Sequence, residues 1–563
     1  MIKSFGSDLK RVISLKKMII LLAILLISYG FYITNFCIGI DALAKDRYLS
    51  GEYIAQGRVG RTIIFNVLGF DKTMPFAESV TSVLLLAMAA IVFSGAYQRV
   101  ATKKLSDLSV IAFQTMFVAY SLVNEIFIYK EASLVIGFCY LLSALVSWCI
   151  ADCVSKELHF NKKNVVIIIL LLTFQLSTFE SFASVYLFSV FSLIWLKLSR
   201  YAADKNISGK TILKFVFVTM LIMVVAVLGK YVLATLIRTA RNIPVSTSSS
   251  NQVYWFSRNF VSTLIGLVTG FIKYYFVYGF WYYPIMLYAV SCFVLLFITA
   301  RYFNRNHKIL WILVSAGMLV STVAVQIIQG GGVTKYSSCQ VFCLFVAFIV
   351  MILSNLFNDY YLKSKTSVRK LASGFGIAVI ICCIWYSAID LNNWFVVDYQ
   401  RYQEEVQILR NIDADLSEYP TDEKPVIFVG QIKLSDNIIK YTHVEYDAKS
   451  YIRAKSVLRI MGIDLDDWHG NGDFDSKVYF DKYNMANGNS CINWGVFAFR
   501  EANTELHKIF EYHGYVYARP TMEQYLEANL LIPKFNAAYP KNGYIQETND
   551  YIVVYLGGSS QLE

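Results

Sequence analysis

Charged residues are scarce in this chain, and the deficit is concentrated in the first 390 of its 563 residues. Asp, Glu, Lys and Arg together make up 16% of the sequence, whereas an ordinary soluble domain carries about 25%. Apolar runs of roughly 16–24 residues separate the charges, and each is long enough to cross a bilayer core of about 30 Å as a helix. The pattern predicts membrane-spanning helices, because lipid cannot satisfy an open backbone.

Several functional motifs are also missing. The sequence contains no HExxH, GxSxG or Walker A pattern and no nucleotide-binding fingerprint, which disfavours a zinc hydrolase and a P-loop enzyme. Cys491 is the only cysteine after residue 390, so this tail has no internal disulfide. The first apolar run follows a basic segment, but no small-residue cleavage site comes after it, and we interpret it as an uncleaved span.

The apolar runs predict a polytopic α-helical membrane protein with about eleven spanning helices. The predicted spans are residues 18–39, 77–97, 108–124, 132–151, 164–179, 181–198, 211–234, 283–303, 308–328, 338–357 and 371–389. The segments 164–179 and 181–198 nearly touch, so they form either a tight helical hairpin or one long tilted helix, and the charge pattern favours the hairpin.

Lysines and arginines set the predicted orientation. They cluster at the N-terminus and in alternate loops, which therefore face the cytoplasm. The opposite loops lie outside: 40–76, 124–131, 235–282, 329–337 and the whole tail. Residues 390–563 hold 16 Lys/Arg and 26 Asp/Glu, against 35 and 14 in the rest of the chain. The net charge of +11 is thus a topology signal, and no nucleic acid is expected as a partner.

Segment 260–280 allows two interpretations. It is apolar enough to span, but it carries Lys273 in its middle, and a crossing here would invert every later loop. An interfacial or re-entrant helix rich in Tyr and Phe keeps the charge pattern consistent. Gly266 and Gly270 have GxxxG spacing, which is also typical of a packed crossing helix.

The tail changes character and predicts a second domain. Residues 399–416 have the periodicity of an amphipathic helix, and residues 425–429 and 551–555 are typical of buried strands. We therefore expect a transmembrane domain over 1–390, with a first outer loop at 40–76, and an extracytoplasmic soluble α/β or α+β domain over 391–563, large enough for its own core.

The first outer loop holds the most suggestive residues. Asp41 emerges at the end of the first span, and Asp46, Glu52, Arg58 and Arg61 follow. Sugar transfer from a lipid phosphate needs a base for the acceptor hydroxyl and cations for the leaving phosphate. A carboxylate and two arginines, three residues apart on one helical face, would supply both. The alternative is a solvated loop with ordinary charges.

Three further residues are candidates on the outer side. Glu180 and Glu125 lie near outer membrane edges among apolar residues, where an ionisable group is a functional hypothesis, although a solvated carboxylate is an equal alternative for Glu180. Either acid could hold a metal or orient the acceptor. Lys335 follows a run of glycines that would let a phosphate approach the backbone. The alternative for Lys335 is a flexible turn before a helix.

Five short motifs resemble the bacterial GtrII-type glucosyltransferases, which belong to the multispanning GT-C class. They are the first span ending in Ile40-Asp41, Gln56-Gly57-Arg58 before an apolar helix, Phe179–Phe182 with Tyr186, Asp398–Arg401, and Lys424–Gly430. The resemblance implies that Asp41 is the acidic catalytic residue. The family often has a second acid beside it, where this chain has Ala42, so Asp46 is the nearest alternative. At 179–180 the family commonly has Tyr-Gln in place of Phe-Glu.

The resemblance implies a membrane glycosyltransferase of the bacterial plasma membrane. It would move glucose or another hexose from a polyprenyl-phosphate donor to a cell-surface polysaccharide or lipid-linked acceptor at the outer face, as in O-antigen or teichoic acid modification. Asp41 and Asp46 are the catalytic candidates, Arg58, Arg61 and Lys335 the phosphate ligands, and Glu52, Glu125 and Glu180 the acceptor or metal candidates. A divalent cation (Mg²⁺ or Mn²⁺) is left open. The alternatives are a transporter or flippase, or a polymerase or ligase, of lipid-linked glycans.

Overall fold

The computed structural model is helical over most of the chain. It describes residues 2–35, 37–43, 45, 48–101, 104–123, 127, 130–199, 208–246, 255, 259–272, 275–276, 283–301, 308–330, 338–363, 366–432, 435, 438 and 500–558. These residues fall into two compact units. The first unit comprises the described residues up to Thr34 and those from Tyr48 to Asn393, and the second comprises residues 35–45 together with the described residues from Trp394 onward.

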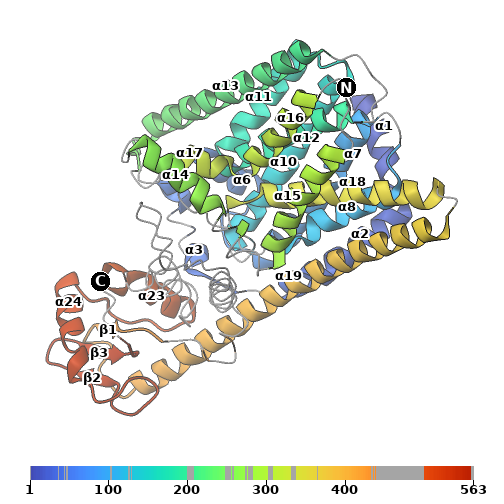
Figure 1. Cartoon of the computed structure of the whole chain (residues 1–563). Helices are drawn as coiled ribbons and strands as arrows, with labels where there is room; N and C mark the ends of the chain where they lie inside the picture. The colour runs from blue at the N-terminus through green and yellow to red at the C-terminus, as the bar shows by residue number, and fades with distance from the viewer. Residues whose placement is uncertain are drawn as a thin grey trace. The chain divides into compact units, whose positions relative to one another are not determined.

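The first unit is a bundle of helices (Figure 1). Its elements are α1 (Ile2–Val12), α2 (Leu15–Thr34), η1 (Tyr48–Glu52), α5 (Tyr53–Ala55), α6 (Val59–Leu68), α7 (Pro75–Val100), α8 (Asp107–Ala119), η2 (Ser121–Val123), α10 (Lys130–Ser155), α11 (Lys162–Leu176), η3 (Glu180–Phe182), α12 (Ala183–Leu198), α13 (Gly209–Arg241), α14 (Phe260–Phe271), α15 (Tyr283–Arg301), α16 (Lys308–Thr322), α17 (Ala324–Gln329), α18 (Val341–Lys363) and the first part of α19 (Ser367–Leu416).

Eight helices in the described part of the chain are long and apolar enough to cross a membrane: α2, α7, α10, α12 with η3, α13, α15, α18 and α19. The prediction of a polytopic helical protein is therefore confirmed. The three other predicted spans correspond to α8, α11 and α16, which have 13, 15 and 15 residues. Each falls short of the ~20 residues that a bilayer core requires.

The structure settles the form of one ambiguous segment and describes part of the other. Between α11 and α12 the backbone leaves the helix at Phe179 (φ −153°, ψ 109°), so 164–198 is two helices rather than one long helix. Helix α14 covers only 12 residues of the segment 260–280, about 18 Å at 1.5 Å per residue. By itself α14 is too short to span, although Lys273 lies outside the described residues.

Aromatic rings fill the centre of the bundle. Phe117 of α8 contacts Tyr140 of α10 (centroids 5.3 Å apart), and Tyr140 contacts Phe182 of η3 (4.9 Å). All three side chains are buried, and such edge-on contacts stabilise by about 0.5–1.5 kcal/mol each. Helix α13, in contrast, presents a long row of exposed apolar side chains, as expected for a helix that faces lipid.

An ion-pair cluster closes one end of the bundle. Arg99, near the end of α7, pairs with Asp8 of α1 (2.7 Å) and with Asp152 near the end of α10. The Trp148 indole donates to Asp8 (3.1 Å), and Asn164 donates to Asp152 (2.9 Å). Because both carboxylates are buried and share one guanidinium, the cluster fixes α1 against the ends of α7 and α10.

The second unit is built around a three-stranded mixed sheet. Its elements are α3 (Ile40–Leu43), the end of α19, β1 (Val426–Val429), α23 (Arg500–Tyr512), α24 (Met522–Leu530), η11 (Ile532–Lys534), β2 (Ile545–Glu547) and β3 (Ile552–Tyr555). The strand order is β1-β3-β2, with β1 parallel and β2 antiparallel to β3. The strands expected at 425–429 and 551–555 are present as β1 and β3.

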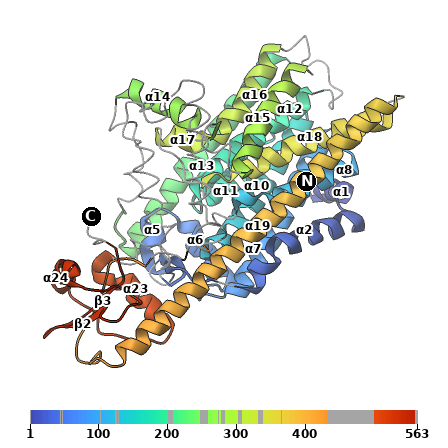
Figure 2. The same cartoon turned by 60° about the horizontal axis from the view of Figure 1, so that its bottom comes forward.

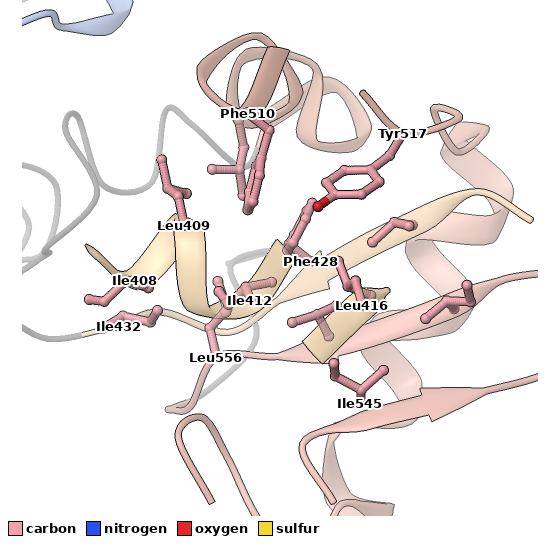
Figure 3. Packing of buried hydrophobic residues seen from close by; sticks show 14 of the residues in the cluster. Ile408, Leu409, Ile412, Leu416, Phe428, Ile432, Phe510, Tyr517, Ile545 and Leu556 are labelled. Carbon is pink, nitrogen blue, oxygen red and sulfur yellow. The ribbon is translucent and has the colours of Figure 1, made fainter. Parts of the chain in front are cut away.

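The core of the second unit lies between this sheet, the end of α19 and α23 (Figure 3). Leu409 and Leu416 of α19 pack towards Phe428 of β1, and Phe510 of α23 stacks on the Phe428 ring (centroids 4.7 Å apart). The apolar stripe of the amphipathic segment 399–416 is therefore buried in this core. This burial supplies the hydrophobic stabilisation, at about 25 cal/mol for each Å² removed from water.

Candidate functional site

The candidate site begins where the chain turns between α11 and α12. The Phe182 ring is fully buried against Tyr140. The Ser181 hydroxyl donates a hydrogen bond to Gln340 Oε1 of the segment before α18 (2.7 Å). These two contacts anchor the turn on both sides. Glu180, the first residue of η3, is consequently held in a defined place.

Helix α6 starts directly against this turn, beside α11 and α13 (Figure 2). Gly57 adopts a left-handed conformation (φ 78°) that favours glycine and reverses the chain into the N-cap residue Arg58. The Gly60 N–H donates to the Ser177 carbonyl (2.9 Å). A Cβ at Gly60 would lie 2.0 Å from Thr178 Oγ1, so only glycine permits this approach.

Glu180 is the centre of a cluster of charges. Its Oε1 accepts a hydrogen bond from Lys230 Nζ of α13 at 2.7 Å, and its Oε2 lies 3.5 Å from Arg58 Nε. The Lys230 side chain is only 9% exposed, whereas those of Arg58 and Glu180 are 33% and 41% exposed. The carboxylate therefore neutralises a buried lysine on one side and meets a partly buried guanidinium on the other.

Arg61 lies one helical turn after Arg58 and extends the cluster. It is buried (7% exposed), and its Nε donates to the Thr178 carbonyl (3.3 Å). Its guanidinium lies over the rings of Tyr53 and Phe179, 5.1 and 4.9 Å from their centroids. Cation–π contacts of this kind stabilise a desolvated cation by about 1–2 kcal/mol. These contacts orient Arg61 and do not use the two terminal nitrogens of its guanidinium, Nη1 and Nη2.

A short hydrogen-bonded chain supports Arg58 from the loop side. Gln56 Oε1 accepts from Arg58 Nη1 (3.3 Å), and Gln56 Nε2 donates to Glu52 Oε1 (3.2 Å). The Gln56 amide thus links the Glu52 carboxylate to the Arg58 guanidinium: its NH2 group donates to the carboxylate, and its oxygen accepts from the guanidinium. Helix α5, within this stretch, packs on α13, and the Ser246 N–H beyond the end of α13 donates to the Ala55 carbonyl (3.1 Å).

Positive charge exceeds negative charge at the centre of this cluster. Arg58 and Lys230 pair with Glu180, and Arg61 lies over the ring of the preceding residue, Phe179. No other carboxylate of the described residues forms an ion pair with these three cations. Burial lowers the pKa of the Arg58 guanidinium, and the neighbouring Arg61 lowers it further, while Glu180 opposes both effects. An arginine stays protonated regardless, so the arrangement favours binding of an anion.

The structure brings together four of the residues predicted from the sequence: Glu52, Arg58, Arg61 and Glu180. Asp41 lies in α3 and belongs to the second unit. Asp46, Glu125 and Lys335 lie outside the described residues. Within the described residues, no group of three or more His, Cys, Asp or Glu side chains could hold a metal ion.

Lys230 is the residue of this cluster that sequence reasoning missed. It interrupts the apolar run Val227-Leu-Gly-Lys-Tyr-Val232 within a predicted span. A lysine at membrane depth is expected to have a partner, and that rule singled out Glu180 from the same sequence. Applied to Lys230, the same rule predicts an acidic partner for this lysine, but it does not predict which carboxylate that is.

These observations define a class of protein. The chain is a multi-pass helical membrane protein whose polar groups gather at a helix break, next to apolar surface on α13. The family model described as Glucosyl transferase GtrII matches residues 30–354, which is more than half of the chain. The chain therefore belongs to the GtrII glucosyl transferase family, as its motifs predict, and membership implies glucosyltransferase activity. A comparison with curated proteins finds no match.

Proposed function

We propose that the protein transfers glucose from a polyprenyl-phosphate donor to a surface polysaccharide or its lipid-linked precursor, at the outer face of the bacterial plasma membrane. The observation that carries this proposal is the gathering of Arg58, Arg61 and Lys230 around Glu180. All four residues lie inside the segment that matches the family. A GT-C type reaction with a lipid-linked donor fits this placement.

The charge of the cluster suits a phosphate that carries a lipid chain. Arginine binds phosphate through two parallel N–H groups, and lysine binds it as a point charge. Glu180 would keep Arg58 and Lys230 apart and oriented while the phosphate is absent. The exposed apolar side of α13, which includes Leu228, Val232 and Leu236, offers the polyprenyl chain a route within the bilayer. A nucleotide sugar has no apolar group that would use this surface.

In the proposed reaction, the acceptor hydroxyl oxygen bonds to C1 of the sugar as the bond from C1 to the phosphate oxygen breaks. The electron pair leaves with the polyprenyl phosphate, whose growing negative charge Arg58, Arg61 and Lys230 would stabilise. The proton of the hydroxyl passes to a carboxylate. We assign that role to Asp41, with Asp46 as the alternative, and Glu52, Glu125 and Lys335 remain candidates for acceptor or donor contacts.

The hexose content of the surface polysaccharide tests this proposal in a deletion strain. We expect the wild-type gene to restore a hexose that the deletion removes, and Asp41→Asn to restore none at normal expression. Arg58→Ala and Lys230→Ala should restore it at least about tenfold less well, and extra donor synthesis should reverse part of the defect. Lys214→Ala, an exposed lysine on the same helix, is the matched control. Full restoration by Arg58→Ala and Lys230→Ala would refute the phosphate role.

A further inference from the structure

The motif Asp398–Arg401 has no role in the cluster around Glu180, and its environment suggests another one. It lies on α19 within the second unit, where residues 35–45 also belong. The polypeptide just before and within α3 packs on this part of α19. Cys37, Ile38 and Ala42 form one buried cluster with Tyr402, and all four are less than a tenth exposed. Helix α3 carries Asp41.

One stripe of side chains on α19 makes this contact. Tyr399, Tyr402 and Val406 have the i, i+3, i+7 spacing that lines one face of a helix. Tyr402 belongs to the buried cluster with Cys37 and Ala42, and Tyr399 and Val406 pack against it. The neighbouring stripe is polar. Asp398 and Arg401 form an ion pair of 2.7 Å with side chains only 12% and 11% exposed.

Helix α3 also contacts a second cluster. Leu43 packs against the core of the second unit, whose members include Leu409 of α19 and Phe510 of α23. Helix α3 itself packs on α23 (Figure 1). A four-residue helix has no stability of its own, so its position depends on these neighbours. The fold of the second unit thus determines where the backbone at Asp41 lies.

We propose that Tyr399, Tyr402 and Val406 form a seat that positions the α3 helix, so that the second unit contributes to the chemical step and not to donor binding. Tyr402 is a positioning residue in this account, because it acts through the backbone that carries Asp41. The proposal rests on the base role assigned to Asp41 above. It predicts distinguishable defects: seat variants lower kcat alone, whereas variants of the Glu180 cluster also raise the KM for the donor.

The test compares two buried tyrosines of the second unit in the full-length protein. Tyr402 (9% exposed) belongs to the seat, and Tyr525 (3% exposed) belongs to a separate cluster with Ile427 and Val553. Each is changed to Ala, and transfer is measured from polyprenyl-phosphate glucose onto membranes of a deletion strain, which hold the unmodified acceptor. Thermal unfolding of each variant is measured in parallel.

We expect Tyr402→Ala to lower kcat at least about tenfold with the donor KM within about twofold of wild type, and Tyr402→Phe to restore kcat because the ring fills the seat. Tyr525→Ala should keep its kcat at a comparable loss of thermal stability. An equal fall in kcat for Tyr525→Ala, or a raised KM alone for Tyr402→Ala, overturns the seat. If Tyr402→Ala has a normal rate and Asp41→Asn is inactive, the seat is rejected and the base role of Asp41 stands. An active Asp41→Asn rejects the base role and the seat with it.

Discussion

A methyl group at position 60 would have no room. The Cβ of an alanine at Gly60 would lie 2.0 Å from Thr178 Oγ1, 2.9 Å from Ser177 Oγ and 3.1 Å from the Phe174 carbonyl oxygen. The last of these is backbone and cannot rotate away. The α6 helix would have to move off the turn, and Arg58 and Arg61 would move with it.

We therefore expect Gly60→Ala to destabilise the protein by about 1–3 kcal/mol, as overpacking of a tight contact generally does, and to weaken donor use about tenfold. Gly69→Ala is a useful contrast, because no heavy atom of the described residues lies within 4 Å of the Cβ it would add, although its backbone has φ 72°. Thr178→Ala should restore part of the activity in the Gly60→Ala background. Donor KM and thermal unfolding check this prediction, and an unchanged KM in Gly60→Ala would contradict it.

At the scale of single residues, the sequence indicated three of the four residues of the cluster around Glu180. Arg58, Arg61 and Glu180 were identifiable because charges stand out beside apolar runs. Lys230 was not, because a single lysine in a long apolar helix has no partner visible in the sequence. The pairing joins residues 50 positions apart and depends on how α13 packs on α11, which periodicity does not reveal.

At the scale of the helices and strands, a buried histidine on one helix of the second unit makes this unit sensitive to acid. His507 of α23 has an Nε2 atom 3.0 Å from the Val426 carbonyl oxygen of β1, so the neutral ring must carry its proton there. Its Nδ1 is buried and has no hydrogen-bond partner among the described residues. Burial lowers the pKa of His507 from 6.5 to about 4.

We expect the second unit to lose stability as the pH falls. The unfolded chain binds the proton below about pH 6.5 and the folded chain only below about pH 4, so the loss accumulates between these values and reaches about 3 kcal/mol. His507→Gln should remove most of this dependence, since an amide can still donate to Val426. Hydrogen exchange of the β1 amides, corrected for the intrinsic pH effect, measures it. Equal acid sensitivity in the variant would contradict the assignment.

Long elements were predictable from sequence and short ones were not. The runs that became α7, α10 and α18 are continuous and apolar, and their lengths are set by the membrane. Helices α8, α11 and α16 also follow apolar runs, but each ends early: α11, for example, stops before Ser177, where the turn towards Glu180 begins. The small helix α3 has no periodic signal, and its position comes from contacts with α19 and α23.

In the molecule as a whole, the second unit is built from two separate stretches of the chain. The boundary after Asn393 lies close to the change in composition at residue 390, but residues 35–45 join the second unit from the other end of the sequence. Hydropathy marks only the first boundary. The second depends on packing between segments more than 350 positions apart, such as Ala42 and Tyr402.

Phosphate binding by Arg58, Arg61 and Lys230 is the basis of the proposed function. Its most direct test is the affinity of the purified protein for polyprenyl-phosphate glucose, compared between wild type, Arg58→Ala/Lys230→Ala and Lys214→Ala. We predict that the double variant raises Kd at least about thirtyfold, near 2 kcal/mol, and that salt weakens wild-type binding more than binding by the variant. Equal affinity of all three proteins would contradict phosphate binding by these residues.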